Sequence, residues 1–171
     1  MTAEQGGVLY LKNRQRLLPI DTRLLRCIGR ALLRDLPGGD RYDLGVYLVR
    51  AAEIQRLNES FLQHEGSTDV ITFDYADPAQ PDLIHGEIFI CVDEAVTQAR
   101  RFRTTWQAEL VRYLIHGVLH LSGYDDRRSS DRRKMKRAED RLLRELRSLF
   151  FIKKLGGHPP AARDPRNPGS A

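Results

Sequence analysis

Apolar residues recur along the chain with two different spacings, and these spacings predict the secondary structure. Short apolar or alternating runs predict β-strands, whereas longer segments with an apolar residue every three or four positions predict helices. The predicted strands cover residues 8–12, 44–49, 69–73 and 87–92. The predicted helices cover residues 21–36, 51–62, 93–102, 105–121 and 130–149. Because strands and helices interleave, we expect an α+β fold with a mixed four-stranded sheet packed with about five helices.

The chain divides into one predicted domain and a tail. Residues 1–155 contain every predicted element and no internal linker, and this length supports one core rather than two. Residues 156–171 are rich in Gly, Pro and Ala and have almost no apolar content. We expect this tail to be disordered, because it cannot bury enough surface to offset the loss of conformational entropy.

The composition is that of a soluble globular protein. Of 171 residues, 41% are hydrophobic and 30% are charged, and no apolar run reaches the ~20 residues that span a bilayer. The first residues lack the basic and apolar regions of a signal peptide, so we expect a cytoplasmic protein. Cys27 and Cys91 are far apart, and we interpret them as reduced, buried residues rather than parts of a disulfide or a thiolate metal site.

The net charge of +5 is unevenly distributed along the chain. Residues 1–126 carry a net charge of −4, residues 127–147 carry +6 and residues 148–171 carry +3. The predicted last helix has an apolar stripe that can pack on the body, formed by Met135, Ala138, Leu142, Leu146 and Leu149. Its basic side chains would then face a polyanion such as RNA, although a merely solvated face is the alternative. The expected phosphate contacts are Arg132, Arg133, Lys136, Arg137, Arg141 and Arg144.

The most informative segment is an apolar helix that contains two histidines. From Tyr113 to Leu121 every residue other than His116 and His120 is apolar or glycine, which is the pattern of a buried helix. The two histidines are four residues apart and therefore lie one turn apart on the same face. Buried imidazoles need partners, because an unpaired buried polar group costs about 1–3 kcal/mol. A divalent metal ion would satisfy both, and two hydrogen-bonded core histidines are the alternative.

A glycine seven residues after His116 predicts how such a site is completed. Gly123 can end the helix in the left-handed conformation, so that the chain turns back and brings Asp125 and Asp126 toward the histidines. The offsets of 0, +4 and +10, with glycine at +7, match the metzincin zinc motif with Asp126 in place of its last histidine. The predicted metal ligands are therefore His116, His120 and Asp126. Three protein ligands leave a fourth position for water, which is typical of a catalytic site.

The residue after His116 argues against a protease. Metzincins have a glutamate there as general base, whereas this chain has Gly117, so the metal ion itself or another carboxylate must activate water. Either route suits hydrolysis of a phosphodiester. A glycine in mid-helix also indicates the close approach of a neighbouring element. An iron oxygenase, which also uses two histidines and a carboxylate, is an alternative that ranks low because nothing marks a cosubstrate site.

The histidine motif resembles that of a known family. Residues 116–126, His-Gly-Val-Leu-His-Leu-Ser-Gly-Tyr-Asp-Asp, resemble the signature of the YbeY family of bacterial metal-dependent endoribonucleases. Residues 67–73 and 86–91 also resemble segments of that family. The resemblance implies one zinc ion per chain at the end of the buried helix and cleavage of single-stranded RNA. It also implies a role with the ribosome, in maturation of the 16S ribosomal RNA 3′ end and in ribosome quality control.

The chain departs from the family pattern at two positions. Asp126 replaces the third histidine, so the predicted site has two histidines and a carboxylate. Leu62 falls where the family has an arginine, and a leucine cannot contact phosphate. The catalytic group other than metal-bound water therefore stays unknown. The alternative function is a non-catalytic ribosome-assembly factor whose metal ion only stabilises the fold.

Overall fold

The order of elements in the computed structural model, which describes residues 6–62 and 68–159, matches the predicted order. The strands are β1 (Val8–Asn13), β2 (Tyr42–Val49), β3 (Val70–Asp74) and β4 (Ile84–Cys91). The α-helices are α1 (Thr22–Arg34), α2 (Ala51–Leu57), α3 (Val92–Phe102), α4 (Trp106–Leu121) and α5 (Ser129–Leu149). The two short helices are η1 (Asn58–Leu62), a π-helix, and η2 (Ile152–Leu155), a 3₁₀ helix.

The four strands form one mixed sheet, as predicted, in the order β1-β2-β4-β3. Strands β1 and β2 are parallel, β2 and β4 are parallel, and β3 runs antiparallel to β4. Strand β4 is therefore an interior strand, and its continuous apolar run is explained by burial on both faces. Ile88 and Ile90 are fully buried in the main core, whereas Phe89 and Cys91 are buried in a smaller cluster that also contains Ile54 of α2.

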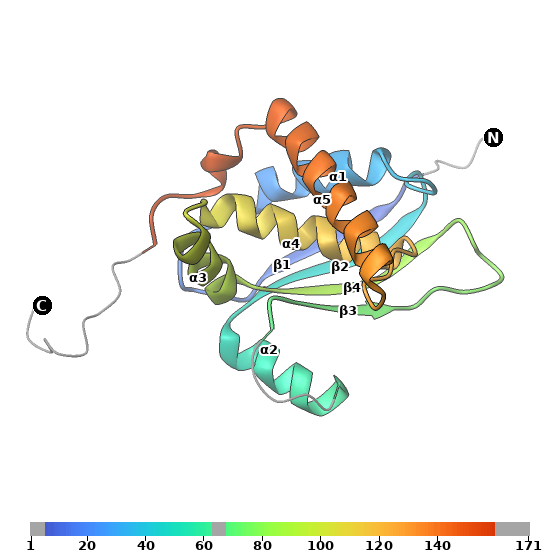
Figure 1. Cartoon of the computed structure of the whole chain (residues 1–171), viewed down its shortest axis with the longest axis horizontal. Helices are drawn as coiled ribbons and strands as arrows, with labels where there is room; N and C mark the ends of the chain where they lie inside the picture. Colours follow the sequence, from blue (N-terminus) through green and yellow to red (C-terminus); the bar gives the residue numbers. More distant parts are fainter. Residues whose placement is uncertain (1–5, 63–67, 160–171) are drawn as a thin grey trace, which may run out of the picture.

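The helices cover the two faces of the sheet unequally. Helices α1, α4 and α5 lie on one side, with α4 between the sheet and α5, and α2 lies on the other side (Figure 1). Helix α4 is the centre of the molecule, and thirteen of its sixteen residues are buried. Thr105 caps its first turn through a hydrogen bond from the Ala108 amide. The apolar surface all round this helix is thus explained by contact on every side.

Two side chains that we expected to be buried are exposed. Cys27 is exposed, because it lies one position before the buried Ile28 and so about 100° around α1 from it. Leu149 is 66% exposed, although the other four residues of its predicted stripe are buried. It is the last residue of α5, where the chain leaves the helix beside the exposed Phe151.

Residues of the predicted tail contact the body of the protein, so the packed part of the chain extends further toward the C-terminus than we predicted. The carbonyl oxygen of Leu155 accepts a hydrogen bond from the Asp21 amide. The carbonyl oxygens of Gly156 and Gly157 accept hydrogen bonds from the side chains of Gln107 and Trp106. Four residues of the predicted tail, 156–159, are therefore described, and residues 160–171 lie outside the described part of the chain. Among the described helices, none combines the length and apolar character needed to cross a bilayer.

Candidate metal centre

The turn after α4 reverses the chain as the sequence predicts. Gly123 has a φ of +95°, in the left-handed region that favours glycine. The amide of Tyr124 donates to the carbonyl of Leu119 over 3.0 Å, and the amide of Gly123 donates to the carbonyl of His120 over 3.1 Å. These bonds satisfy carbonyl groups at the end of the helix and close the turn. The chain therefore returns toward the face of α4 that carries the histidines.

The reversal brings the three predicted ligands together. The Nε2 atoms of His116 and His120 lie 3.0 Å apart, and Oδ2 of Asp126 lies 3.5 Å from Nε2 of His120. One ligand atom from each residue lies within 4.8 Å of the other two. All three residues are half-buried. The zinc bonds of such ligands are about 2.0–2.2 Å long, so atoms that are 3.0 and 3.5 Å apart can share one ion, and the three residues together could hold it.

The other ring nitrogens of the histidines explain why a cation fits here. Nδ1 of His116 lies 2.5 Å from Oε1 of Glu139, and Nδ1 of His120 lies 3.2 Å from the carbonyl oxygen of Tyr124. Each acceptor requires a proton on Nδ1, so in the neutral rings both Nε2 atoms carry lone pairs. Two lone pairs that face each other at 3.0 Å repel unless a proton or a cation lies between them. The donor set therefore fits a divalent metal ion.

Asp126, rather than its neighbour Asp125, faces the histidines. The Asp125 carboxylate accepts hydrogen bonds from the backbone amides of Asp126 and Arg127. These bonds hold the pKa of Asp125 below its usual range, and the bond from the Arg127 amide has the larger effect. Asp125 thus stabilises the loop, and Asp126 is left as the carboxylate beside the ring of His120.

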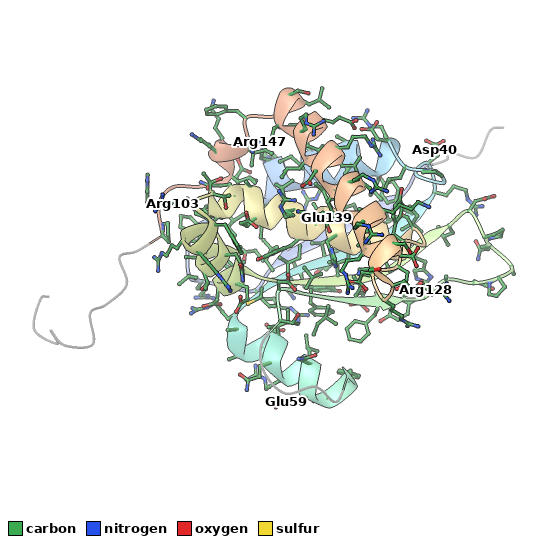
Figure 2. The ribbon with its side chains drawn as sticks, viewed as in Figure 1. Asp40, Glu59, Arg103, Arg128, Glu139 and Arg147 are labelled. Atoms are coloured by element: carbon green, nitrogen blue, oxygen red, sulfur yellow. The ribbon has the colours of Figure 1, made fainter. Side chains whose placement is uncertain are left out.

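Glu139 is a site residue that the sequence analysis missed. Its side chain is only 8% exposed and lies where α5 crosses α4 (Figure 2). Burial by itself would lower the pKa of His116, but the hydrogen bond to Glu139 and its charge outweigh this effect, so the pKa lies above its ordinary value. The available signal was an acidic residue that directly follows Ala138 and lies four residues after Met135 in the apolar stripe of α5.

The predicted phosphate contacts on α5 are all exposed, but they differ in their partners. Three of them are engaged: Arg132 donates to the carbonyl of Asp126, Lys136 lies 3.2 Å from the Asp140 carboxylate, and Arg141 lies 3.2 Å from that of Glu145. The side chains of the remaining three form no hydrogen bond or ion pair with any other described residue: Arg133, Arg137 and Arg144. Their spacing of four and seven residues places them along one exposed stripe of the helix.

Comparison with known proteins identifies the family. Residues 11–147 match the family described as Endoribonuclease YbeY. A protein of that name from Chlorobium luteolum is 40% identical over 119 residues, which cover 68% of this chain and 85% of the relative. Another from Syntrophotalea carbinolica is 32% identical over 150 residues, covering 85% of this chain and 99% of the relative. The chain therefore belongs to the YbeY family of endoribonucleases, as its histidine motif predicted.

A solved structure agrees with the fold. The solution structure of a Thermotoga maritima protein superposes with a TM-score of 0.63 and 24% sequence identity, and the match covers 91% of this chain and all of that one. At this level of identity the likeness concerns the fold. The predicted α+β architecture, with a cluster of possible metal ligands at the end of a buried helix, is thus confirmed.

Proposed function

We propose that this protein is a zinc-dependent endoribonuclease that cleaves single-stranded segments of ribosomal RNA. It would act in the cytoplasm on the ribosome or its precursors, in maturation of the 16S ribosomal RNA 3′ end and in ribosome quality control. The observation that carries the proposal is the convergence of two imidazole Nε2 atoms and one carboxylate oxygen at the end of α4. Family membership supplies the reaction class.

One zinc ion per chain would be held by His116, His120 and Asp126. Two imidazoles and a carboxylate suit Zn²⁺, and three protein ligands are typical of its catalytic sites. The bound ion would supply Lewis acidity, which lowers the pKa of water and stabilises charge that develops on a phosphoryl group. The carboxylate of Asp126 adds one negative charge to the ligand set. We expect water at this site to be less acidic than it would be beside three histidines.

The chain's own residues would bind and orient the RNA. The exposed arginines of α5 begin beside the metal ligands, because Arg132 donates to the backbone of Asp126 itself. A single strand whose phosphates lie along α5 would therefore pass the ligand cluster. Gly117 provides no carboxylate next to His116, so water would have to be activated by the metal ion itself or by another carboxylate. These features support hydrolysis of a phosphodiester rather than of a peptide.

The test compares two histidine variants of the full chain. His116→Ala removes a ligand, so zinc content and cleavage of a single-stranded ribosomal RNA fragment should both be lost. His85→Ala is the control, because that histidine is partly exposed and lies beside Asp43 and Tyr75 rather than in the ligand cluster. Zinc is measured by elemental analysis and cleavage by gel electrophoresis. Undiminished cleavage by His116→Ala would contradict the proposal.

The same assay separates an enzyme from a non-catalytic assembly factor. The reason to test this alternative is Leu62, which stands where the family has an arginine. Stoichiometric zinc and tight RNA binding, with no cleavage in the presence of any divalent metal, would favour the assembly factor. Cleavage that depends on His116 would exclude it. A matched Asp126→Ala variant should also lose zinc, which would establish the carboxylate as the third ligand.

A further inference from the structure

A buried carboxylate lies behind one of the proposed metal ligands, and we propose that it positions this ligand for the ion. The residue is Glu139 of α5, and the ligand is His116 of α4. Glu139 would hold the His116 ring in one orientation, with its proton on Nδ1, so that Nε2 is free to bind metal. This inference rests on the proposed function, because the ion is the one assigned above to His116, His120 and Asp126.

The geometry distinguishes a positioning role from direct coordination. Oε1 of Glu139 lies 2.5 Å from Nδ1 of His116, whereas Nε2 of the same ring faces His120 at 3.0 Å. Nδ1 and Nε2 point away from each other on an imidazole ring, so Glu139 lies behind the ring and not at the ion. Glu139 therefore acts through His116. Metal-binding histidines commonly donate their second N–H to a carboxylate or carbonyl, which fixes the tautomer and raises the basicity of the ligand nitrogen.

The two histidines of the site differ in the group that orients them. His120 has a neutral backbone carbonyl, that of Tyr124, 3.2 Å from its Nδ1. His116 has a charged carboxylate at a shorter distance. Because a hydrogen bond to an ionised acceptor is stronger than one to a neutral acceptor, the ring of His116 is held more firmly. We infer that His116 is the stronger donor of the two to the metal ion.

The surroundings of Glu139 argue against a purely structural ion pair between helices. Burying a carboxylate costs several kcal/mol unless close partners compensate. Arg112 of α4 gives its short contact, 2.7 Å, to Asp140, and it lies 3.8 Å from Glu139. Lys136 also lies 3.8 Å from Glu139 and closer, at 3.2 Å, to Asp140. Asp140 already joins α5 to Arg112, and the nearest partner of Glu139 is the metal ligand.

The first experiment measures zinc affinity in the full chain by competition with a chromophoric chelator. Glu139→Gln keeps an acceptor oxygen but loses the charge, and Glu139→Ala loses both. Loss of such a supporting group typically weakens metal binding 10–100-fold, so we expect about tenfold for Gln and about a hundredfold for Ala. Asp140→Asn is the matched control, because it disturbs the contact with Arg112 but does not touch His116. Its zinc affinity should stay close to that of the wild type.

The second experiment reads the His116 tautomer in the metal-free chain by ¹⁵N NMR, at a pH where the ring is neutral. The wild type and Glu139→Gln should carry the proton on Nδ1, and Glu139→Ala should gain the Nε2–H form. A purely structural role for Glu139 would not change this signal. If Glu139→Ala does not fold, the zinc affinity of Glu139→Gln decides.

Two results would overturn the inference. They are a zinc affinity of folded Glu139→Gln equal to that of the wild type, and an unchanged tautomer in folded Glu139→Ala. If the wild type itself bound no zinc, the proposed function would fail, whereas the tautomer measurement would still decide whether Glu139 orients His116. The two failures are therefore distinguishable.

Discussion

At the scale of single residues, Tyr113 carries a polar group in an apolar place. Its hydroxyl is buried and has no hydrogen-bond partner in the described part of the chain. Burial, with the nearby charges of Asp69 and Glu109, raises the pKa of Tyr113, so the phenol is neutral. An unsatisfied buried group costs about 1–3 kcal/mol. We therefore expect Tyr113→Phe to raise the free energy of unfolding by about 1 kcal/mol in urea titrations.

The control for this prediction is a tyrosine whose hydroxyl does have a partner. The hydroxyl of Tyr75 donates to Oε1 of Glu87 over 2.8 Å, on the exposed surface. Tyr75→Phe should therefore leave stability unchanged or slightly lower. A loss of stability in Tyr113→Phe would show that the buried hydroxyl is satisfied in solution, and would refute the explanation.

At Gly117 the packing depends on the absence of a side chain. A Cβ at this position would lie 2.7 Å from Cγ2 of Ile88 and 2.9 Å from its Cδ1, and Ile88 is fully buried. Alanine favours a helix over glycine by about 1 kcal/mol, but overpacking a core costs about 1–3 kcal/mol. We expect Gly117→Ala to lower the free energy of unfolding by about 1–2 kcal/mol.

Gly157→Ala is the matched control for that substitution, because a Cβ there meets nothing within 4 Å. Both variants are compared with the wild type by urea denaturation, and Gly157→Ala should unfold as the wild type does. A stabilised Gly117→Ala would mean that α4 can move away from β4, and that helix propensity outweighs the contact with Ile88.

Residues whose relative positions are set by neighbours along the chain could be placed from the sequence. His116, His120 and Asp126 follow from a helix and a turn, so their spacing was enough to predict the cluster. Glu139 is 23 positions beyond His116, and its contact depends on how α5 is rotated against α4. That rotation is a tertiary property, so spacing alone did not predict it.

At the scale of elements, the turn between α4 and α5 has the largest consequence for the site. Among the described residues between His116 and Asp126, only Gly123 has a positive φ. This conformation lets the chain reverse after α4. The left-handed conformation costs other residues about 1–2 kcal/mol. We expect Gly123→Ala to be destabilised by about that amount and to bind zinc more weakly, because Asp126 would be displaced. Urea denaturation and chelator competition measure the two effects.

Gly123→Asn provides an internal check on this explanation, since asparagine tolerates the left-handed conformation better than alanine. It should recover much of both the stability and the zinc affinity. Space is not the issue, because a Cβ at Gly123 meets nothing within 4 Å. Equal losses in the alanine and asparagine variants would contradict a conformational cause.

The predicted element boundaries failed where backbone geometry departs from a regular helix or strand. The predicted helix over residues 51–62 is α2 followed by η1, and Phe61 of η1 is 65% exposed beside Phe73. A π-helical turn shifts the side chains that follow it around the axis, and the 3.6-residue period does not reveal it. Strand β4 begins three residues before its predicted start, because Ile84 pairs with Tyr42 of β2.

At the scale of the whole molecule, the change from an acidic to a basic sequence coincides with the boundary between the body and α5. The body up to residue 126 is acidic, and the basic segment that follows forms α5, on the side of α4 away from the sheet (Figure 1). The amphipathic stripe of α5 predicted this arrangement, because burying one face leaves the other in water. The helix therefore holds Glu139 behind His116 on its inner face and carries a row of arginines on its outer face.

The outer face of α5 gives a prediction about RNA binding. Each phosphate contact with single-stranded RNA contributes about 0.7 to the slope of log K against log salt concentration. Arg133 and Arg137 are exposed and form no ion pair within the described ranges, so both are available to phosphates. The double variant Arg133→Ala/Arg137→Ala should reduce that slope by about 1.4 in fluorescence-anisotropy titrations.

The control for this prediction is Arg100→Ala/Arg101→Ala on α3, which also removes two exposed positive charges and should keep the wild-type slope. Equal reductions in both variants would mean that net charge, and not the face of α5, attracts the RNA.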